Sequence, residues 1–484
     1  MPQISDAELQ RLLRENQRLR EENERQRKQI AQLEKRIADL ERLLAGRMKD
    51  STNSSKPPSS DGPAAARRSK PARCRGRRKP GGQPGHPGRH RELVPLEGVD
   101  QIIPLLPSKC RGCGQPLPQQ VEQVRRVGEV QRYQVSELPP VQAQIIEYQC
   151  HKVACPHCGQ ATRAELPAEV RASLFGPRLV GLMAYLTVGL RIPRRGVEQL
   201  LETVLGIEIS LGSTQNLVEQ TSEALAATCQ ELEQQLPNEP VLNCDETGWR
   251  SQGERRWLWA FVGSSFVFFA IAANRSSKVL IHLLGTVFPG ILCSDRFGAY
   301  FKYHTGRAQL CWAHLKRDLL GILEFARTTE AERFARNALA LTARLFRLWH
   351  RFRGGGLDRA ELIDQSIPLQ KRFFGLCERH LDSTDKEVCV LASALFQHCD
   401  RLFAFIEYAG VEPTNNGAER ALRHAVIWRK GSFGNQSRQG EIATARLLTV
   451  ARTCVMQRRN AVEFLSESVR RYRAGQPPLS LLPR

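Results

Sequence analysis

Apolar residues recur on a strict heptad in the first part of the chain. Across residues 6–45, eight of the eleven positions of the a/d seam are apolar, and charged residues fill most other positions. A period of about 3.5 residues predicts a coiled coil, and asparagine at two a positions favours a parallel dimer in fixed register. A solitary solvated helix is the alternative. The a positions are Leu9, Asn16, Asn23, Ile30, Ile37 and Leu44, and the d positions are Leu12, Leu19, Gln26, Leu33 and Leu40.

The pattern of residues 173–236 is helical. RRGVEQLLETVLGIEIS followed by LGSTQNLVEQTSEAL predicts two helices joined by a tight turn, with Ser210 or Ser213 as N-cap. This arrangement suits a helix-turn-helix that enters a DNA major groove. Two packed helices with a short connection are also common in any helical domain, so the pattern alone does not establish DNA reading.

After Pro240 the pattern changes to short apolar runs that are typical of strands. PVLNCDET, RRWLWAFVG and SFVFFAIAA predict three strands, SSKVLIHLLGTVF predicts a helix, and GILCSDRF predicts a fourth strand. We expect Asp245 to end the first strand and Asp295 to end the fourth. Adjacent parallel strands would then place both carboxylates at one edge of the sheet, where divalent cations would offset their repulsion. Either Asp alone would be interpreted as a turn or cap residue.

Two C-x-x-C sequences, KCRGCGQPL and ACPHCGQ, each place a glycine directly after the second cysteine. Such knuckles turn two thiolates toward one ion, and a pair of them forms a closed tetrahedral zinc site. They are separated by 41 residues, of which residues 124–150 are rich in Val, Ile and Tyr, and there we expect strands within a zinc-ribbon-like module. Competing ligands would be Cys150, His151 and His157. The predicted ligands of structural Zn²⁺ are Cys110, Cys113, Cys155 and Cys158.

Composition narrows the class of protein. The chain has 484 residues, 41% of them hydrophobic, which suits two or three globular domains. No apolar run approaches the roughly 20 residues of a membrane span, and no signal-peptide pattern is present, so we expect a cytosolic protein. The 14 cysteines are too few for a disulfide framework. The net charge of +21 favours an acidic partner such as nucleic acid, although a ribosome-associated or membrane-surface protein would share it.

Much of that charge lies in a segment dominated by Ser, Pro, Gly and basic residues. Between Arg47 and Glu92 there are 13 Lys and Arg but three Asp and Glu. The segment has too little apolar area to fold alone. It is either a flexible arm whose arginines neutralise DNA phosphates or a solvated linker.

A third acidic motif completes a recognisable set. DET after an apolar strand, SDRFGAY after a second, QLCWAHLKRDL beyond it, and PTNNGAERALR leading into WRKGSFGNQSRQG resemble the DDE transposases of the IS66 insertion-sequence family. The resemblance covers nearly the whole chain, including the coiled coil, the NSSKPPSSDG and GGQPGHPG linker and the cysteine knuckles.

The resemblance implies a ribonuclease-H-like catalytic fold in which Asp245, Asp295 and Glu419 bind two Mg²⁺ or Mn²⁺ ions. It implies DNA cleavage by water and strand transfer by the freed 3′-hydroxyl, without a covalent enzyme intermediate. The implied partners are double-stranded DNA of the terminal inverted repeats and of the target, a second copy of the chain and accessory proteins of the element, in the bacterial cytosol near the nucleoid. Alternatives are a non-catalytic DNA-binding regulator and a ribonuclease-H-type nuclease acting on RNA hybrids.

Other residues near these motifs are candidates for supporting roles. Cys311 and His314 supply half a zinc site, and we interpret His314 as lying near the substrate phosphate or against a carboxylate, with a core histidine as the alternative. Trp312 would stack on a base or belong to the core. Glu246 would point away from Asp245. Thr414, Asn415 or Asn416 would cap the helix that carries Glu419 in its first turn, and the cations expected to meet phosphates are Arg420, Arg423, Arg429 and Lys430.

We therefore predict a multidomain α/β protein with a mixed-sheet catalytic domain interrupted by a helical insertion. The 123 residues between Asp295 and Glu419 exceed what a minimal fold of this type needs, and the insertion would clamp DNA or act as a structural lid. The predicted segments are a coiled coil (1–45), a basic linker (46–93), a zinc-binding module (94–168), a helical DNA-binding candidate (169–238), the first part of the catalytic core (239–323), the insertion (324–408), the second part of the core (409–460) and a C-terminal tail (461–484).

Overall fold

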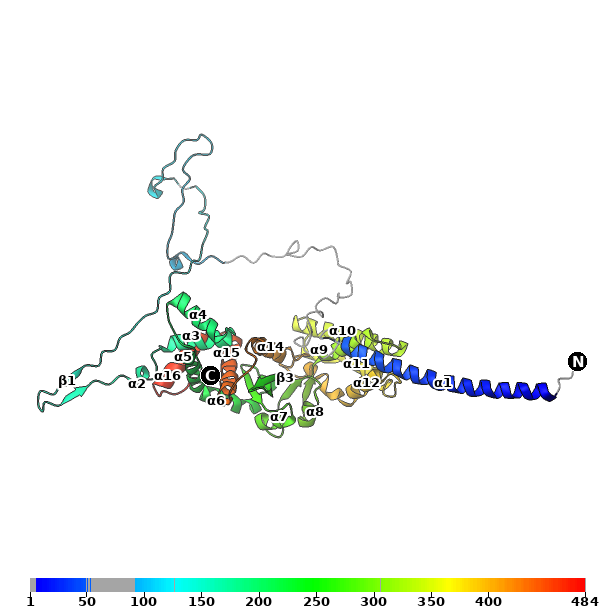
Figure 1. The fold of residues 1–484 in the computed structure, drawn as a ribbon. Coiled ribbons are helices and arrows are strands. Elements are labelled where there is room, and N and C mark those ends of the chain that lie inside the picture. Colours follow the sequence, from blue (N-terminus) through cyan, green and yellow to red (C-terminus); the bar gives the residue numbers. More distant parts are fainter. Residues whose placement is uncertain are drawn as a thin grey trace. The chain divides into compact units, whose positions relative to one another are not determined.

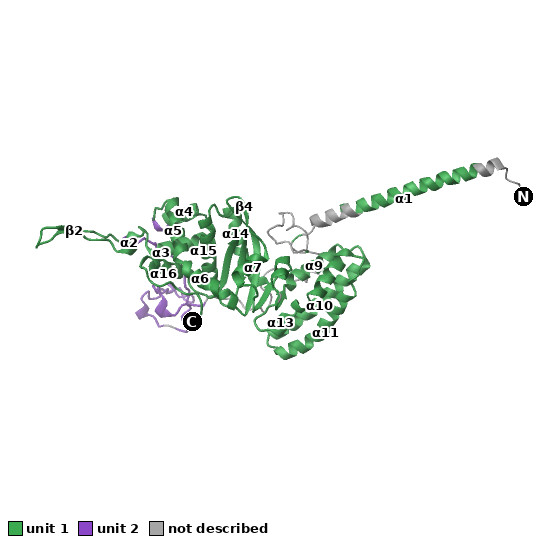
Figure 2. Ribbon diagram, turned by 90° about the horizontal axis from the view of Figure 1, so that it is seen from below, with its two compact units in different colours: residues 1–67, 146–203, 207–484 green, residues 68–145, 204–206 purple. Residues whose placement is uncertain are grey.

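The computed structural model describes residues 6–48, 50, 53, 92–125, 127–304 and 306–483. These divide into two compact units, one formed by residues 1–67, 146–203 and 207–484, the other by residues 68–145 and 204–206 (Figure 2). Nearly all of the predicted basic linker lies outside the described residues. Within the described part, no helix combines the length and apolarity needed to cross a lipid bilayer.

The predicted coiled-coil segment is one continuous helix, α1 (Asp6–Met48), 43 residues long (Figure 1). Its apolar seam is open in the single chain, with more than half of the surface of Leu12, Leu19, Ile30 and Leu33 exposed. The helix is thus confirmed, and its pairing with a second copy stays a prediction.

A five-stranded mixed sheet forms the centre of the larger unit, in the order β5-β4-β3-β6-β7. β3 pairs antiparallel with β4, and β4 with β5, whereas β6 runs parallel to β3 and β7 parallel to β6. The succession of three strands, a helix and a fourth strand is confirmed. The strands are β3 (Val241–Ser251), β4 (Glu254–Val262), β5 (Val267–Ala272), β6 (Ile291–Ser294) and β7 (Ala308–Leu310).

One strand boundary was predicted wrongly. Asp245 does not end β3, because the antiparallel pairing with β4 continues from Asn243 opposite Val262 to Ser251 opposite Glu254. Asp245 therefore lies within a long hairpin strand, opposite Ala260. Only the parallel pairing with β6 ends near Asp245.

Helices cover both faces of the sheet, with α14 on one face and α7 and α8 on the other (Figure 1). The free edge of β5 is closed by α15, whose Thr449 and Thr453 hydroxyls accept hydrogen bonds of 3.0 Å from the N–H groups of Phe269 and Val267. This pairing blunts an exposed strand edge. The helices are α7 (Ser277–Leu284), α8 (Gly298–Tyr303), α14 (Asn416–Ser432) and α15 (Arg438–Met456).

The helical region before the sheet is confirmed. The Ser210 hydroxyl caps α5 by accepting from Ser213 N–H at 3.2 Å, and α5 buries Leu217 and Val218 on its inner face. The predicted C-terminal tail contains a packed helix, α16, which approaches α3 so closely that a Cβ on Gly181 would lie 2.4 Å from Ser466 Oγ. The elements are α2 (Ala168–Arg171), α3 (Pro177–Ala184), the π-helix η5 (Tyr185–Gly189), α4 (Arg194–Leu205), α5 (Leu211–Ala224), α6 (Ala226–Gln235), η6 (Leu236–Asn238) and α16 (Ala461–Arg473).

Residues 324–408, the predicted insertion, are mainly helical and share an apolar core with the preceding helix α9 and with β6 and β7. Trp312 is 1% exposed, donates from Nε1 to Leu402 O at 2.6 Å and lies edge-on to Phe373. A base-stacking role for Trp312 is therefore wrong, and the residue belongs to this core. The elements are α9 (Trp312–Glu324), α10 (Thr329–Arg353), α11 (Arg359–Glu378), α12 (Lys386–Gln397), η7 (Cys399–Arg401) and α13 (Ala404–Glu407).

The strands expected in residues 124–150, between the cysteine knuckles, do not form among the residues described there. Residues 127–150 contain no strand, although their backbone is described throughout. Apolar alternation requires a neighbouring strand to become a sheet, and here side chains such as Val135 and Ile145 stay 92% exposed. The short elements of this region are η3 (Leu96–Gly98), η4 (Val121–Gln123), β1 (Lys152–Ala154) and β2 (Ala161–Arg163).

Candidate active site

The parallel pairing of β3 with β6 brings two of the three acidic motifs together. Val241 pairs with Ile291 and Asn243 with Cys293. Continued by two residues, this register places Asp245 opposite Asp295, which directly follows β6. The observed register therefore agrees with the prediction that the two carboxylates lie close together where β3 and β6 stop pairing.

Burial and mutual repulsion act strongly on Asp245. Burial raises the pKa of this carboxyl well above its usual value, and the charges of Glu246, Asp295 and Glu419 raise it further. One hydrogen bond opposes this effect, from Glu246 N–H to Asp245 Oδ1 at 2.9 Å. We call Asp245, Asp295 and Glu419 the acidic cluster, in which Glu419 acts on Asp245 more weakly than Asp295 does. Among the described residues, the group with ligand atoms all within 4.8 Å of one another joins Glu419 to Cys311 and His314, and not to the two aspartates.

Asp295 is partly buried, with 18% of its side chain exposed, and it has more compensating partners. Burial raises its pKa, while a 2.8 Å hydrogen bond from Phe297 N–H and the cations Arg275 and Arg296 lower it. The Arg275 guanidinium lies 4.0 Å from Asp295 Oδ2. No sequence pattern singles out Arg275, which stands in the loop between β5 and α7.

The helix that carries Glu419 is anchored to the sheet by Asn415. Asn415 occupies the N-cap position of α14, as one of the predicted options, but its side chain does not cap the helix. Instead its Nδ2 donates to Cys244 O at 2.7 Å, and its backbone N–H donates to Cys311 Sγ at 3.1 Å. These bonds fix the first turn of α14, and with it Glu419, beside β3.

The C-x-x-H step lies against the third acid. The ligand atoms of Cys311, His314 and Glu419 are all within 4.8 Å of one another. Burial, and then the cations Arg317 and Arg296, lower the pKa of His314 to about 3, so its ring is neutral at physiological pH. Its Nδ1 lies 3.5 Å from Glu419 Oε1. This contact agrees with a histidine that supports a carboxylate.

The same Glu419 oxygen also has a cationic neighbour. Arg317 Nη2 approaches Glu419 Oε1 at 3.5 Å. Burial raises the pKa of the Cys311 thiol, which disfavours the thiolate that a zinc ion would need. The arrangement therefore suits a buttress for Glu419 better than a second zinc site.

Glu246 lies on the core-facing side of β3, the opposite side from Asp245. Its carboxylate accepts hydrogen bonds from Arg275 Nε and from the Tyr300 hydroxyl. Arg275 therefore contacts both Glu246 and Asp295. This agrees with the expectation that Glu246 is not a cation ligand.

The four predicted phosphate-binding cations separate into two groups. Arg420, Arg423 and Lys430 are exposed on α14. Arg429 is not exposed in the same way, because its guanidinium donates to Gly248 O and pins the helix to β3. Arg429 thus holds the scaffold, and the other three are free to meet a ligand.

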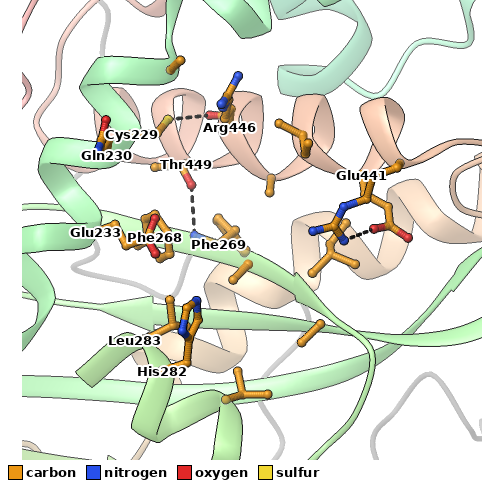
Figure 3. A pocket seen from close by; sticks show the side chains of 18 of the residues that line it. Cys229, Gln230, Glu233, Phe268, Phe269, His282, Leu283, Glu441, Arg446 and Thr449 are labelled. Atoms are coloured by element: carbon orange, nitrogen blue, oxygen red, sulfur yellow. Dashed lines mark hydrogen bonds and ion pairs between the residues drawn. The ribbon is translucent and has the colours of Figure 1, made fainter. Parts of the chain in front are cut away.

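A sizeable cavity of the described part lies elsewhere. It has a volume of about 640 Å³ and is lined by residues of α6, β5, α7 and α15. Figure 3 shows Thr449 reaching Phe269 across it, with Glu441 at its far end and His282 below. None of the three acidic-cluster residues lines this cavity, so it is not the candidate active site.

The two cysteine knuckles fold as near copies of each other. In the first, Gly114 N–H donates to Cys110 O at 2.9 Å, and in the second, Gly159 N–H donates to Cys155 O at 2.9 Å. Both glycines have a left-handed backbone, with φ of 73° and 75°. This conformation is the reason for glycine after the second cysteine.

The knuckle turns also lower the pKa of the first cysteine of each knuckle and so favour its thiolate form. Backbone hydrogen bonds from Cys113 and Gly112 lower the pKa of Cys110, and those from Cys158 and His157 lower the pKa of Cys155. Thiolate is the form that binds zinc. Each knuckle therefore presents the chemistry of half a zinc site.

The acidic cluster suits a different kind of ion. Carboxylate oxygens are the ligands that Mg²⁺ and Mn²⁺ prefer. A cation shared by Asp245 and Asp295 would offset the burial and repulsion that raise their pKa values. The donor set of the cluster thus fits the cations expected from the sequence.

Comparisons with known proteins match several parts of the chain. The family described as "Transposase IS66 family" matches residues 172–443, more than half of the chain. The "zinc-finger binding domain of transposase IS66" matches residues 107–159, which include all four knuckle cysteines, and a family of unknown function matches residues 2–92.

Two relatives come from Sinorhizobium fredii (strain NBRC 101917 / NGR234). The uncharacterized protein y4qI is 26% identical over 420 residues, which cover 79% of this chain and 74% of that protein. The uncharacterized protein y4hP is 23% identical over 427 residues, which cover 81% of this chain and 74% of that protein.

Proposed function

The chain belongs to the IS66 transposase family, and from that membership we propose that it cleaves the ends of its element and joins them to target DNA at Asp245, Asp295 and Glu419. The observation that carries the proposal is the register of β3 and β6, which ends at Asn243 opposite Cys293 and, continued by two residues, would set Asp245 opposite Asp295. The charge of Glu419 also acts on Asp245, which supports a place for the third acid near the two aspartates.

The topology of the sheet supports a ribonuclease-H-like catalytic domain. Numbered along the chain within the sheet, the strands are ordered third, second, first, fourth, fifth. Asp245 lies on β3, Asp295 directly follows the adjacent parallel strand β6, and Glu419 lies on the later helix α14, which packs on the sheet. This arrangement is the one expected for nucleases and transposases of that class.

The residues of the site would divide the work between cation binding and DNA binding. Asp245, Asp295 and Glu419 would hold divalent cations, which when bound activate the attacking hydroxyl and stabilise the departing 3′-oxygen. His314 would help to position Glu419. Because its ring is neutral, it would not compete with a metal ion for the Glu419 carboxylate. The exposed cations of α14 would hold the DNA backbone beside the acids.

The knuckles would bind one structural zinc ion through Cys110, Cys113, Cys155 and Cys158. Their matched turns and lowered thiol pKa values support this set. Closing a four-thiolate site would join two segments that are far apart in sequence. The coiled coil would pair two copies, as two-ended DNA substrates require.

The test is a metal-dependent nicking assay with purified full-length protein and duplex DNA from the inverted repeats that flank the gene. We expect Asp245→Asn to lower cleavage roughly a thousandfold or more, as when a group essential to the transition state is removed, and to leave DNA binding intact. The matched control is Asp364→Asn, which changes an exposed aspartate of α11. Cleavage retained by Asp245→Asn would refute the assignment.

The two alternative functions correspond to other outcomes of this assay. A non-catalytic regulator would bind the repeats without nicking them under any divalent cation. A ribonuclease-H-type nuclease would cleave an RNA–DNA hybrid faster than duplex DNA of the same sequence.

A further inference from the structure

Phe433, the residue that follows α14, is exposed and strained at the same time. Its side chain is 79% exposed, and its backbone adopts a left-handed conformation with φ of 59°. Its N–H donates to Arg429 O at 2.9 Å and ends the helix. Glycine or asparagine normally occupies this position, because the Cβ of a bulky residue is strained in the left-handed conformation. Such strain persists where the surroundings enforce it, often for function.

The surroundings of Phe433 are rigid. Asn435 N–H donates to Arg250 O at 2.9 Å, and the Trp249 indole N–H donates to Asn435 Oδ1 at 2.7 Å. Between them, a Cβ on Gly434 would lie 2.1 Å from Arg250 O, so the loop fits tightly against the β3–β4 hairpin. The phenyl ring is therefore projected from a fixed frame, and it contributes nothing to the core.

The ring stands at the end of a basic strip on α14. Four exposed residues recur at spacings of three, four and three, which puts them on one side of the helix. Glu419, beside the start of the strip, is the single acidic residue of the helix. The hairpin next to Phe433 adds the exposed Arg250 and Arg255. The residues of the strip are Arg420, Arg423, Ile427 and Lys430.

The strip has the length of a short DNA contact. From Glu419 to Phe433 the chain rises roughly 20 Å at about 1.5 Å per residue. This distance corresponds to about six base pairs at about 3.4 Å per phosphate of one strand. A duplex whose scissile phosphate lies at the acids would thus pass Phe433 within the same helical turn.

We propose that Phe433 is an apolar wedge that enters between stacked bases of the DNA about six base pairs from the cleaved phosphate, while the α14 cations hold the backbone. The proposal rests on the proposed function. Phenylalanine is one of the residues that unstack base steps in this way, and a rigid, strained mount suits a side chain that must push bases apart. The positive charge around the ring favours DNA over an apolar protein partner.

The experiment measures base unstacking without cleavage. Full-length protein carrying Asp245→Asn is bound to inverted-repeat duplexes in which 2-aminopurine replaces one base at a time. We expect fluorescence to rise several-fold at a step about six base pairs from the cleavage position and to stay low elsewhere. A flat profile with the DNA bound would overturn the wedge but not the proposed catalysis, which Asp245→Asn tests separately.

Substitutions at Phe433 separate the wedge from the fold. Phe433→Gly relieves the left-handed strain, so its melting temperature should equal or exceed that of the parent, yet the fluorescence peak should disappear. Phe433→Trp should keep the peak. The matched control is Phe396→Ala, which removes another exposed phenylalanine, 39% exposed on α12, and should change nothing.

Two further results would contradict the wedge. One is an unchanged peak in Phe433→Gly. The other is a loss of self-association by Phe433→Gly in sedimentation with the fluorescence profile preserved, which would assign the ring to a protein interface.

Discussion

The acidic cluster and the cysteine knuckles are two ion sites built in opposite ways. Each knuckle is completed within six residues by its own turn, and Cys113 and Cys158 are exposed. The acidic cluster depends on residues up to 174 positions apart in the sequence, and a buried sheet and an anchored helix bring them together. The knuckles therefore carry local structure before any ion binds, whereas the acids owe their positions to the core.

The contrast extends to what each site gains from its ion. Hydrogen bonds already favour charged thiolates in the knuckles, so zinc would join segments of chain. Burial opposes charge at Asp245 and Asp295, so the apo site is electrostatically destabilised and a cation would relieve it. Zinc would thus stabilise the structure of the knuckles. A divalent cation at the acidic cluster would offset the unfavourable burial of charged carboxylates.

The largest expected effect concerns zinc. Cys155→Ser should lower the zinc affinity more than about 100-fold, since even outer-shell changes at metal sites cost 10–100-fold. Because no knuckle residue belongs to the apolar core around the sheet, the melting transition of that core should move little. Zinc content by mass spectrometry and circular dichroism melting measure the two effects.

Cys150→Ser is the control for this experiment, because Cys150 is the nearest competing thiol. We expect it to retain one zinc ion per chain. Loss of zinc in Cys150→Ser, with retention in Cys155→Ser, would change the ligand set. A collapse of the core transition in Cys155→Ser would contradict the separation of the two sites.

The difference between the sites also explains what the sequence predicted. Features that depend on neighbouring residues could be predicted from short patterns. They are the knuckle glycines, the Ser210 cap and the order of strands around Asp245 and Asp295. The cationic neighbours of the acids could not be predicted from short patterns. Arg275 approaches Asp295, and Arg317 approaches Glu419, only once the chain has folded.

The errors have the same origin. The strands predicted within residues 127–150 failed because an alternating pattern does not report whether a partner strand exists. Arg429 was grouped with phosphate-binding cations because sequence spacing does not reveal that it donates to Gly248 O. The end of β3 was misplaced because its antiparallel neighbour, and not its parallel one, sets its length.

The second prediction tests the anchored helix of the acidic cluster. Asn415→Ala would remove the bond to the buried Cys244 carbonyl and cost about 1–3 kcal/mol in the free energy of unfolding. Cleavage should fall further than stability alone explains, because Glu419 loses its fixed position. Urea unfolding and nicking at saturating Mg²⁺ measure both.

Asn416→Ala is the matched control, because Asn416 is the exposed neighbour at the same helix end. It should change stability by less than about 0.5 kcal/mol, as surface substitutions usually do. Equal effects of the two variants would mean that the Asn415 side chain does not anchor α14.

The smallest expected effect is the pH dependence of the metal-free cluster. The pKa of Asp245 is raised in the folded state, so this residue stabilises the fold below its ordinary pKa of 3.8 and that contribution is lost as pH rises toward the raised value. Asp245→Asn cannot ionise and should be more stable than the parent at pH 7.5, by about 1–2 kcal/mol, with a smaller difference at pH 5. Mg²⁺ should stabilise the parent more than the variant, while Asp364→Asn should follow the parent throughout. If the metal-free parent is more stable than Asp245→Asn at pH 7.5, the charged carboxylate does not destabilise the fold. The acidic cluster would then not differ from the knuckles in what it gains from an ion.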